Sequence, residues 1–407
     1  MREFGVPLTP ARGVADWRER LDRVGGRAMT VVGDWLSPGE RVSRSEPRIS
    51  ALVAVVAVAG GVLPILVMAV TWAAKPDPVA HVPACRVAHE MTGYVLADRP
   101  AEDRYQPDRQ CNSADAPNTV ERTGTGRYLV VFGKLGRDGG VAAVTPVTGD
   151  DRICTLPDWR PEGADELVQV DCFDRSGAAA DSGFTAHFWD VSPGGETGGT
   201  AAYLRLGDPG RTSQTVEDAY SHNSAGGANS AGREDVGSYV VYFGGLEAVE
   251  GGTVRVTPVA DAATVCGVER WFAYPEGRYL AARVRCRDAG GQPVDARFAV
   301  TFTLGVGAPG VAGAHVLADR PAEASYTPEG VAQFSSGGQA AAVTRSEPGE
   351  YRVELPGLAL KSGNLQVTAY DTAASCVART ATGDVRITCR DPSGAAADTK
   401  FLLTYWD

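Results

Sequence analysis

Pairs of aspartates recur three times in this 407-residue chain at one spacing, Asp-x-x-Gly-x-x-x-Asp, and their oxygens could ligate a calcium ion. The copies run from Asp174 to Asp181, from Asp288 to Asp295 and from Asp391 to Asp398. Two carboxylates fall short of the six to eight oxygens that calcium prefers. An aspartate that caps a tight turn through its own backbone, followed by one that begins a strand, explains the same spacing. We therefore predict turns here and no metal site.

Six aromatic side chains could offer flat faces on which a sugar ring stacks. They are Tyr94, Tyr105, Trp159, Trp271, Tyr326 and Trp406. Aromatic residues of a β-sandwich more often fill the core or cover its edges, and a hydrogen bond then holds the polar tip. A carbohydrate surface built from these residues is therefore the weaker of the two hypotheses.

Familiar catalytic motifs are missing from the sequence. It contains no Gly-x-Ser-x-Gly elbow, no His-Glu-x-x-His pair and no phosphate-binding loop. His89 is followed by a glutamate, as in a zinc helix, but Gly93 stands where the second histidine would be. In the repeats described below, His187 corresponds to Thr301 and Thr404 on the outward face of a strand, so we expect a solvated surface histidine. We predict a protein without catalytic residues and without a cofactor.

Eight cysteines all follow the apolar stretch at residues 51–74, and an oxidising exterior lets disulfides persist. The predicted pairs are Cys154–Cys172, Cys266–Cys286 and Cys376–Cys389, one in each repeat, together with Cys85–Cys111 in the first. Cys376 and Cys389 are equidistant from the Thr382-Gly383 step, so a hairpin that turns there places them opposite each other. Metal binding is the weaker alternative, because there is no Cys-x-x-Cys and the histidines lie elsewhere.

Internal repetition is the most informative feature of the chain. The octapeptide VLADRPAE occurs at residues 95–102 and again at 316–323. A tyrosine opens a strand-like run in each copy, as Tyr128, Tyr239 and Tyr351. Counted from Cys172, Cys286 and Cys389, all three copies have aspartates at +2 and +9, a glycine at +5 and a phenylalanine at +12. Stretches rich in glycine and proline, near residues 192–200 and 305–313, separate the copies.

Strands of alternating character fill each repeat. In the last strand of the first copy, Phe184, Ala186 and Phe188 would share one face, because successive side chains of a strand point to opposite sides. About eight such runs fit into each ~100-residue repeat, as in a two-sheet sandwich. We therefore predict an all-β ectodomain of three tandem two-sheet β-sandwich modules, separate from one another, with boundaries near residues 195 and 309.

The repeat pattern is best preserved in the third copy, which reads VLADRPAE…SYTP…QFSSGG…YRVELPGL…NLQVTAY, then two cysteines and Asp-x-Ser-Gly. This pattern resembles a tandem β module of secreted and surface proteins of high-GC Gram-positive bacteria. No activity is assigned to that module. The resemblance therefore implies a surface location and a repeat architecture only.

Residues 51–74 carry no charge, and about 20 apolar residues suffice for a helix to span a bilayer. Arg41, Arg44 and Arg48 precede the segment. The side richer in basic residues stays in the cytoplasm, so the N-terminus is predicted inside and the C-terminal modules outside the cell. Trp72 stands where cleavage of a signal peptide needs a small residue, so we predict an uncleaved signal anchor.

The tail before this segment carries a heptad-like apolar stripe that includes Val14, Trp17 and Leu21 and is interrupted by Gly25 and Gly26. A homodimer could form through this tail or through the transmembrane helix, or the tail could lie on the membrane surface. A poorly ordered tail with one helical stretch is the alternative. The net charge of −11 makes nucleic acid an unfavourable partner, because its phosphates repel an acidic surface.

The sequence thus divides into a cytoplasmic tail (1–48), a transmembrane signal anchor (49–74) and three β modules (85–190, 200–304 and 313–407). We expect a membrane-anchored bacterial surface protein with a non-enzymatic binding or structural role, whose partner is cell-wall glycan or a surface protein. A transmembrane sensor that relays binding to the tail is one alternative. A cell-envelope hydrolase with an unrecognised site is another, and it predicts a cleft lined by carboxylates present in only one module.

Overall fold

β-Strands form nearly all the regular structure of the chain. The computed structural model describes residues 90–149, 151–191, 199–216, 218–247, 249–305, 312–360, 363–381 and 383–406. Within these residues the helices are three short 3-10 turns, and none is long and apolar enough to cross a membrane. The predicted tail, the signal anchor and Cys85 lie outside the described residues.

The first repeat is built from ten strands in two sheets. They are β1 (Glu90–Ala97), β2 (Arg104–Tyr105), β3 (Gln110–Asn112), β4 (Asn118–Gly124), β5 (Arg127–Phe132), β6 (Val141–Pro146), β7 (Ile153–Thr155), β8 (Trp159–Glu162), β9 (Asp165–Phe173) and β10 (Phe184–Val191). The sheet with the order β3-β1-β10-β6 is called the central sheet. The other, with the order β2-β4-β5-β9-β7 and β8 paired to β9, is called the outer sheet.

The second repeat has the same two sheets. Its elements are β11 (Ala201–Leu206), β12 (Gln214–Thr215), η1 (Asp218–Tyr220), β13 (Ser221–Asn223), β14 (Asn229–Asp235), β15 (Ser238–Gly244), β16 (Thr253–Val259), β17 (Thr264–Tyr274), η2 (Pro275–Gly277), β18 (Tyr279–Asp288) and β19 (Arg297–Thr303). The central sheet has the order β13-β11-β19-β16, and the outer sheet has the order β12-β14-β15-β18-β17. One continuous strand, β17, replaces the separate β7 and β8 of the first repeat.

The third repeat has this strand order again. Its elements are β20 (Gly313–Ala318), β21 (Ser325–Tyr326), η3 (Gly330–Ala332), β22 (Gln333–Ser335), β23 (Ala342–Glu347), β24 (Glu350–Glu354), β25 (Asn364–Tyr370), β26 (Ser375–Ala381), β27 (Asp384–Arg390) and β28 (Lys400–Trp406). Its central sheet runs β22-β20-β28-β25, and its outer sheet runs β21-β23-β24-β27-β26. Equivalent strands can therefore be compared position by position across the chain.

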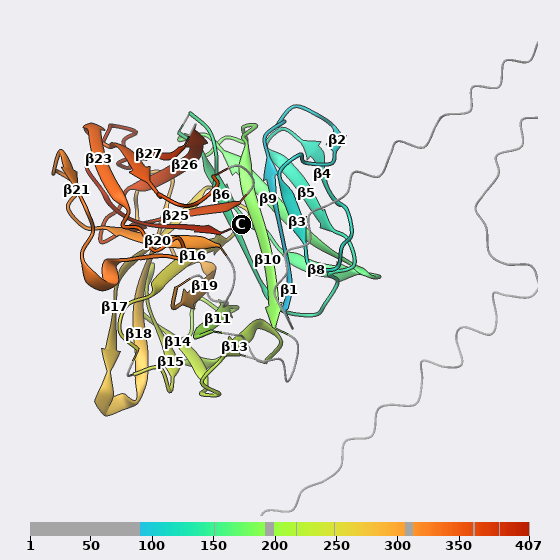
Figure 1. The fold of residues 1–407 in the computed structure, drawn as a ribbon. Coiled ribbons are helices and arrows are strands. Elements are labelled where there is room, and N and C mark those ends of the chain that lie inside the picture. Colours follow the sequence, from blue (N-terminus) through green and yellow to red (C-terminus); the bar gives the residue numbers. More distant parts are fainter. Residues whose placement is uncertain are drawn as a thin grey trace, which may run out of the picture. The chain divides into compact units, whose positions relative to one another are not determined.

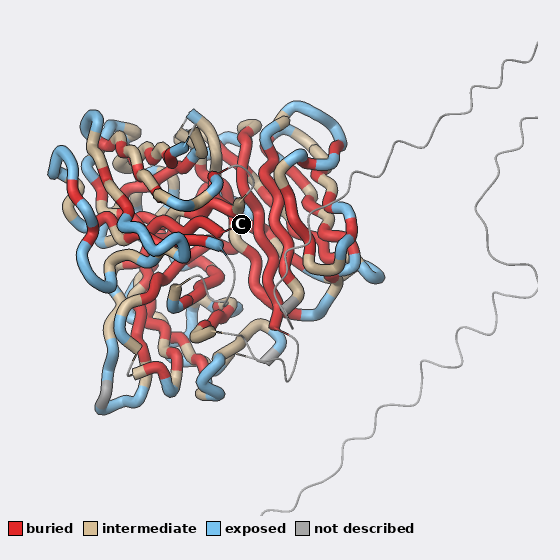
Figure 2. The backbone as a smooth tube through the Cα atoms, viewed as in Figure 1, coloured by how far each residue is buried: buried red, intermediate tan, exposed pale blue. Residues whose placement is uncertain are grey.

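Side chains that alternate along the strands fill the space between the two sheets of each repeat. Phe184, Ala186 and Phe188 of β10 are fully buried in the core of the first repeat, as their spacing predicts. The opposite face of β10 is also covered, because all eight of its residues are buried. A strand with both faces buried lies inside the molecule, and Figure 2 shows such strands crossing its interior.

The repeats are in contact with one another, whereas the sequence predicts separate modules. The described residues of the three repeats belong to one compact unit, in which the repeats lie side by side (Figure 1). β17 pairs in parallel with β25 at Val268 and Tyr370, which joins sheets of the second and third repeats into one nine-stranded sheet. The Leu156 amide donates to the Pro258 carbonyl at 3.1 Å and so links the first repeat to the second.

The edge strand of each central sheet lies on the central sheet of another repeat. β6 contacts β11 and β19 of the second repeat, β16 contacts β20 and β28 of the third, and β25 contacts β1 and β10 of the first. These three contacts use the same strands in the same order. They close a cycle from the first repeat through the second and third back to the first, which we call the contact cycle.

Candidate functional site

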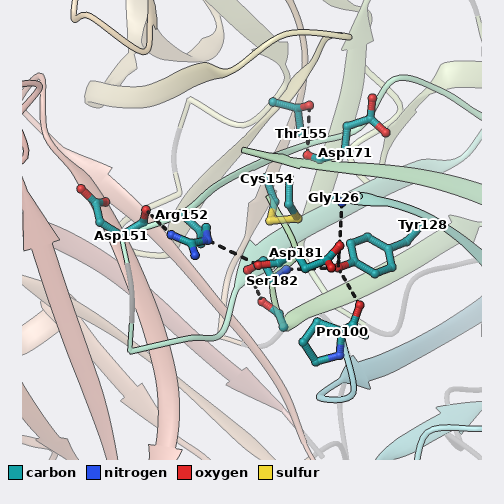
Figure 3. The surroundings of a disulfide bond; sticks show 12 residues. Pro100, Gly126, Tyr128, Asp151, Arg152, Cys154, Thr155, Asp171, Asp181 and Ser182 are labelled. Atoms are coloured by element: carbon teal, nitrogen blue, oxygen red, sulfur yellow. Dashed lines mark hydrogen bonds between the residues drawn. A yellow bond between two sulfur atoms is a disulfide. The ribbon is translucent and has the colours of Figure 1, made fainter. Parts of the chain in front are cut away.

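The repeated tyrosine and the second repeated aspartate meet in one network, here called the aspartate lock. Asp181 accepts a hydrogen bond from the Gly126 amide at 2.7 Å, the Tyr128 hydroxyl lies 3.2 Å away, and Arg122 forms an ion pair at 2.9 Å. Figure 3 shows Tyr128 directed toward Asp181. The same arginine, tyrosine and aspartate are Arg233, Tyr239 and Asp295 in the second repeat and Arg345, Tyr351 and Asp398 in the third. In the first repeat, the lock joins the turn between β4 and β5, which contains Gly126, to the segment before β10, which contains Asp181.

Each locked carboxylate is held in its charged form. Hydrogen bonds from Arg345 are the main reason that the pKa of Asp398 lies below its ordinary value, and the Gly349 amide adds to the effect. Arg233 likewise lowers the pKa of Asp295. The sequence identified the aspartates and tyrosines as repeated, but it did not identify their arginine partner.

The first aspartate of each pair caps a turn, as predicted. Asp174 Oδ1 accepts hydrogen bonds from the amides of Ser176 at 2.8 Å and Ala178 at 3.1 Å. Gly177 has a φ of 83°, a conformation that glycine adopts without steric cost. Both aspartates of the motif are thus engaged by their own chain. Nowhere in the described ranges do three histidine, cysteine or acidic side chains gather as a metal site would require.

The three disulfides that the hairpin argument predicts are present in the structure. They are Cys154–Cys172, Cys266–Cys286 and Cys376–Cys389, each with a Cα–Cα distance of 4.1 Å. In the third repeat the cysteines are direct partners in the register of β26 and β27, which turn between Ala381 and Asp384. Cys111 is also disulfide-bonded, and its predicted partner lies outside the described residues.

Five of the six aromatic residues considered for sugar stacking are buried. They are Tyr94, Tyr105, Trp159, Tyr326 and Trp406. The sixth, Trp271, is half-buried and packs edge-on against Tyr370 of the third repeat at 5.4 Å. These residues therefore serve as core and contact residues, and the sugar-stacking hypothesis is wrong for the five buried ones.

A different aromatic cluster faces solvent on the outer sheet of the second repeat. Tyr274 and Tyr279 stack with their ring centroids 5.1 Å apart and an interplanar angle of 12°, and Tyr242 packs against Tyr279 at 4.5 Å. We call Tyr242, Tyr274 and Tyr279 the tyrosine face. It lies at the end of the long β17–β18 hairpin, yellow in Figure 1, and Figure 2 shows the tip of that hairpin exposed. Tyr274 itself is 41% exposed.

The tyrosine face belongs to one repeat only. Counted from the repeated tyrosine that opens each strand, the position of Tyr242 is occupied by Val131 in the first repeat and Glu354 in the third. Arg283 and Glu234 lie close enough to Tyr242 to influence its pKa, and they form an ion pair of 3.1 Å. Tyrosine and arginine are the residues most enriched in protein-binding surfaces.

A second constellation lies on the covered faces of the central sheets. His187, Thr301 and Thr404 occupy equivalent positions of β10, β19 and β28, as their distance from the repeated phenylalanine shows. On the paired edge strands β6, β16 and β25, the residues directly opposite them are, in the same order, Ala143, Arg255 and Gln366. All of these except Ala143 are buried polar residues. We call His187, Arg255, Thr301, Gln366 and Thr404 the central layer.

Comparisons of the chain with protein-family models, with curated proteins and with solved structures find no match.

His187 is a member of the central layer and is only 6% exposed, so the expectation of a solvated surface histidine is wrong. It does face outward from its own sheet, but Trp406 of the third repeat packs against its ring at 4.9 Å. Its Nε2 lies 3.0 Å from the Thr92 hydroxyl. Burial, with a contribution from the charge of Arg255, lowers the pKa of His187 well below its ordinary value. The imidazole is therefore neutral at pH 7.

A small pocket shows how closely the repeats match where they meet. Its volume is about 60 Å³, and equivalent residues of the three repeats line it. They are Val144, Val256 and Val367, then Pro146, Pro258 and Ala369, and then Cys154, Cys266 and Cys376. The repeats are thus related by an approximate threefold arrangement within one polypeptide.

Two buried carboxyl groups lie in the first repeat, and one of them, Asp190, has an equivalent aspartate in the third repeat, Asp407. Glu166 is fully buried, accepts a hydrogen bond from the Arg137 amide at 3.1 Å and has its pKa raised to about 8, chiefly by burial. Asp190 accepts a hydrogen bond from the Tyr203 hydroxyl at 3.1 Å, and burial raises its pKa as well. The hydrolase alternative predicts a cleft lined by carboxylates present in only one module, and of these two groups only Glu166 has no acidic equivalent. The full burial of Glu166 keeps substrate away from it, however, and favours a structural role.

A larger pocket of about 460 Å³ lies at the junction of the first and second repeats. Arg205 lines it together with Asp158 and Tyr220. The guanidinium of Arg205 pairs with Asp158 at 2.9 Å and lies over the rings of Trp159 and Tyr220 at 4.3 Å and 5.0 Å. Each of these groups already has a partner, so this pocket joins two repeats and presents no free reactive group of its own.

Proposed function

We propose that the chain is a membrane-anchored bacterial surface protein whose three β-sandwich repeats form one non-enzymatic binding unit for cell-wall glycan or a surface protein. The single observation that carries the proposal is the tyrosine face. Stacked aromatic rings exposed to water serve recognition better than stability, because burial would stabilise the fold more than exposure does. Tyr274 and Tyr279 of this face stand at the end of β17 and the start of β18, where the hairpin turns.

The arrangement of the other reactive groups supports a binding role. The repeated aspartates are held in locks and turns, and the cysteines described are in disulfides. Disulfides persist in an oxidising exterior, which agrees with modules outside the cell. The uncharged stretch at residues 51–74 would anchor them, with the N-terminus in the cytoplasm.

Binding by the tyrosine face is tested with the full chain purified in detergent. The purified chain is immobilised on beads. The beads are incubated with purified cell wall in one experiment and with solubilised surface proteins in the other. Tyr274→Ala and Tyr279→Ala should each weaken capture of the partner about tenfold or more, as aromatic anchors of interfaces do. Retention in the cell-wall arm identifies glycan, and retention in the other arm identifies a protein.

Phe334→Ala is the matched control, because it removes another exposed aromatic ring, 39% exposed, from the third repeat. It should leave capture unchanged. Equal capture by wild type, both tyrosine variants and the control would contradict a binding role of this face.

The membrane topology has its own test. Protease added to intact cells from which the wall has been stripped should remove the repeats and spare an epitope tag at residue 1. Loss of the tag, with the repeats retained, would show the opposite orientation.

A further inference from the structure

Arg255 stands out in the central layer because it is the one position where the three edge strands differ in charge. The equivalent residues are Ala143 in β6 and Gln366 in β25, counted from the repeated Val-Thr step that follows each of them. Both equivalents are neutral. The fold therefore does not need a cation at this position, and the guanidinium requires a separate explanation.

Arg255 is mostly buried, and little of its hydrogen-bonding capacity is used. Arg255 is 8% exposed, and its Nε donates to the Thr301 hydroxyl at 3.1 Å. Within the part of the chain that the structure describes, no acidic side chain forms an ion pair with Arg255, and neither terminal nitrogen has a hydrogen-bond partner. Arginine has five N–H donors in a planar fork. The pair of terminal nitrogens is the side of that fork that binds anions.

Charge is retained at this position despite the burial. Burial lowers the pKa of Arg255 to about 10, so the side chain is still protonated at neutral pH. Burial, and in part the charge of Arg255, lowers the pKa of His187, so this histidine is neutral there and supplies no counter-charge. A buried unpaired charge costs several kcal/mol in typical proteins, and native structures pair such groups or bind an ion.

The Thr301 hydroxyl could complete an anion site beside Arg255. It accepts a hydrogen bond from Arg255, so its own hydrogen is available to donate. A hydroxyl donor beside a guanidinium fork suits a small anion better than a peptide or a sugar.

We propose that the central layer binds one small inorganic anion, held by the terminal nitrogens of Arg255 with the Thr301 hydroxyl beside it. The anion supplies the missing negative charge at the point where β16 of the second repeat meets β28 of the third. It therefore stabilises the contact cycle. This inference is independent of what the tyrosine face binds.

Thermal unfolding of the full chain in detergent tests the proposal. The buffer starts with sodium gluconate. Gluconate is replaced stepwise by chloride in one series and by phosphate in another, at constant ionic strength. The melting temperature of the wild type should rise in a saturable way with at least one of the two. At nine times the dissociation constant, the folding equilibrium constant should be about tenfold larger.

Arg255→Gln should abolish the saturable rise, because glutamine is the residue that the third repeat carries at this position and it brings no charge. Arg160→Gln is the control, since Arg160 is an exposed arginine on β8, and it should respond as the wild type does. A saturable rise of the same size in Arg255→Gln would overturn the proposal, as would a wild type that responds to neither anion.

A direct measurement covers the case in which Arg255→Gln does not fold. Crystals of the wild type soaked in bromide should show an anomalous peak at contact distance from the terminal nitrogens of Arg255 if chloride is the stabilising ion. If phosphate is the stabilising ion, a tetrahedral density should appear there in phosphate-soaked crystals. Absence of both features at saturating concentrations would contradict the site.

Discussion

The Thr145 hydroxyl of the first repeat donates a hydrogen bond of 2.8 Å to the side-chain carbonyl of Gln366 in the third repeat, 221 residues further along the chain. The Gln366 amide in turn donates to the Thr185 hydroxyl at 3.2 Å. All three side chains are buried. The first and last repeats are therefore in direct contact, and the second repeat contacts both, so each repeat stabilises the other two.

Replacement of Gln366 by alanine should lower the free energy of unfolding by about 1–3 kcal/mol, because it removes the buried hydrogen bonds that join Gln366 to Thr145 and Thr185 and leaves the Thr145 hydroxyl hydrogen without its acceptor. Urea unfolding monitored by tryptophan fluorescence measures the change. Gln339→Ala removes an exposed glutamine of the same repeat and should shift stability by less than about 0.5 kcal/mol. Equal stability of the two variants would show that this contact contributes nothing.

The aspartate lock predicts a pH-dependent loss on substitution of Asp398. Asp398→Asn should cost about 1–2 kcal/mol at pH 7, a figure reduced for the partial exposure of the site. A carboxyl whose pKa is lowered on folding stabilises the protein above its unfolded pKa, and this contribution is lost as the pH falls through the folded pKa. The deficit of the variant should therefore shrink as the pH is lowered below about 4.

Urea unfolding of wild type and variant between pH 2 and pH 7 measures the deficit, with Asp319→Asn as the control for loss of an exposed carboxylate. A deficit that stays constant over this range would mean that the charge of Asp398 is not what the lock uses.

His187 should make stability fall in mild acid. Its folded pKa is lowered, so below about pH 6.5 the unfolded chain binds a proton that the folded chain excludes, and stability is lost as the pH decreases. The loss should approach about 1.4 kcal/mol per pH unit for this residue. His187→Thr, which introduces the residue of the other two repeats, should show a correspondingly shallower slope between pH 6.5 and pH 5. Identical slopes would contradict a neutral buried imidazole.

Removal of the disulfide of the third repeat should lower the free energy of unfolding by about 3 kcal/mol, because the bond closes a short loop in the unfolded chain. The bond spans 13 residues, and the one in the first repeat spans 18. Cys376→Ala/Cys389→Ala and Cys154→Ala/Cys172→Ala should therefore lose similar amounts in urea unfolding. A loss confined to one pair would mean that local packing, and not chain entropy, is the main term.

Much of the fold could be predicted from the sequence because its signals are local. The spacing of Cys376 and Cys389 around a Thr-Gly step determines the hairpin register, and alternation in Phe184, Ala186 and Phe188 identifies the core face. The turn at Asp174 follows from Asp-x-x-Gly alone. Each of these depends on residues that are near one another in the chain.

The contacts between repeats could not be predicted in the same way, because the partners are about 100 to 220 residues apart in the chain. One signal was available in the last strands. Beyond Arg297 and Lys400 at the strand starts, their outward positions, among them Thr185, His187, Thr301 and Thr404, carry no charged side chain, although a solvated face usually carries several. Neutral outward residues on a strand indicate a covered face. The central layer and the burial of His187 follow from that cover.

The most direct test of the contact cycle is to cut the chain between its repeats. Protease sites are placed in the glycine-rich connections near residues 192–198 and 306–311, and the full chain in detergent is cleaved at both. The account predicts that the fragments stay together in size-exclusion chromatography and melt in a single transition close to that of the uncut protein. Fragments that elute separately, each with its own melting temperature, would show that the repeats are independent modules.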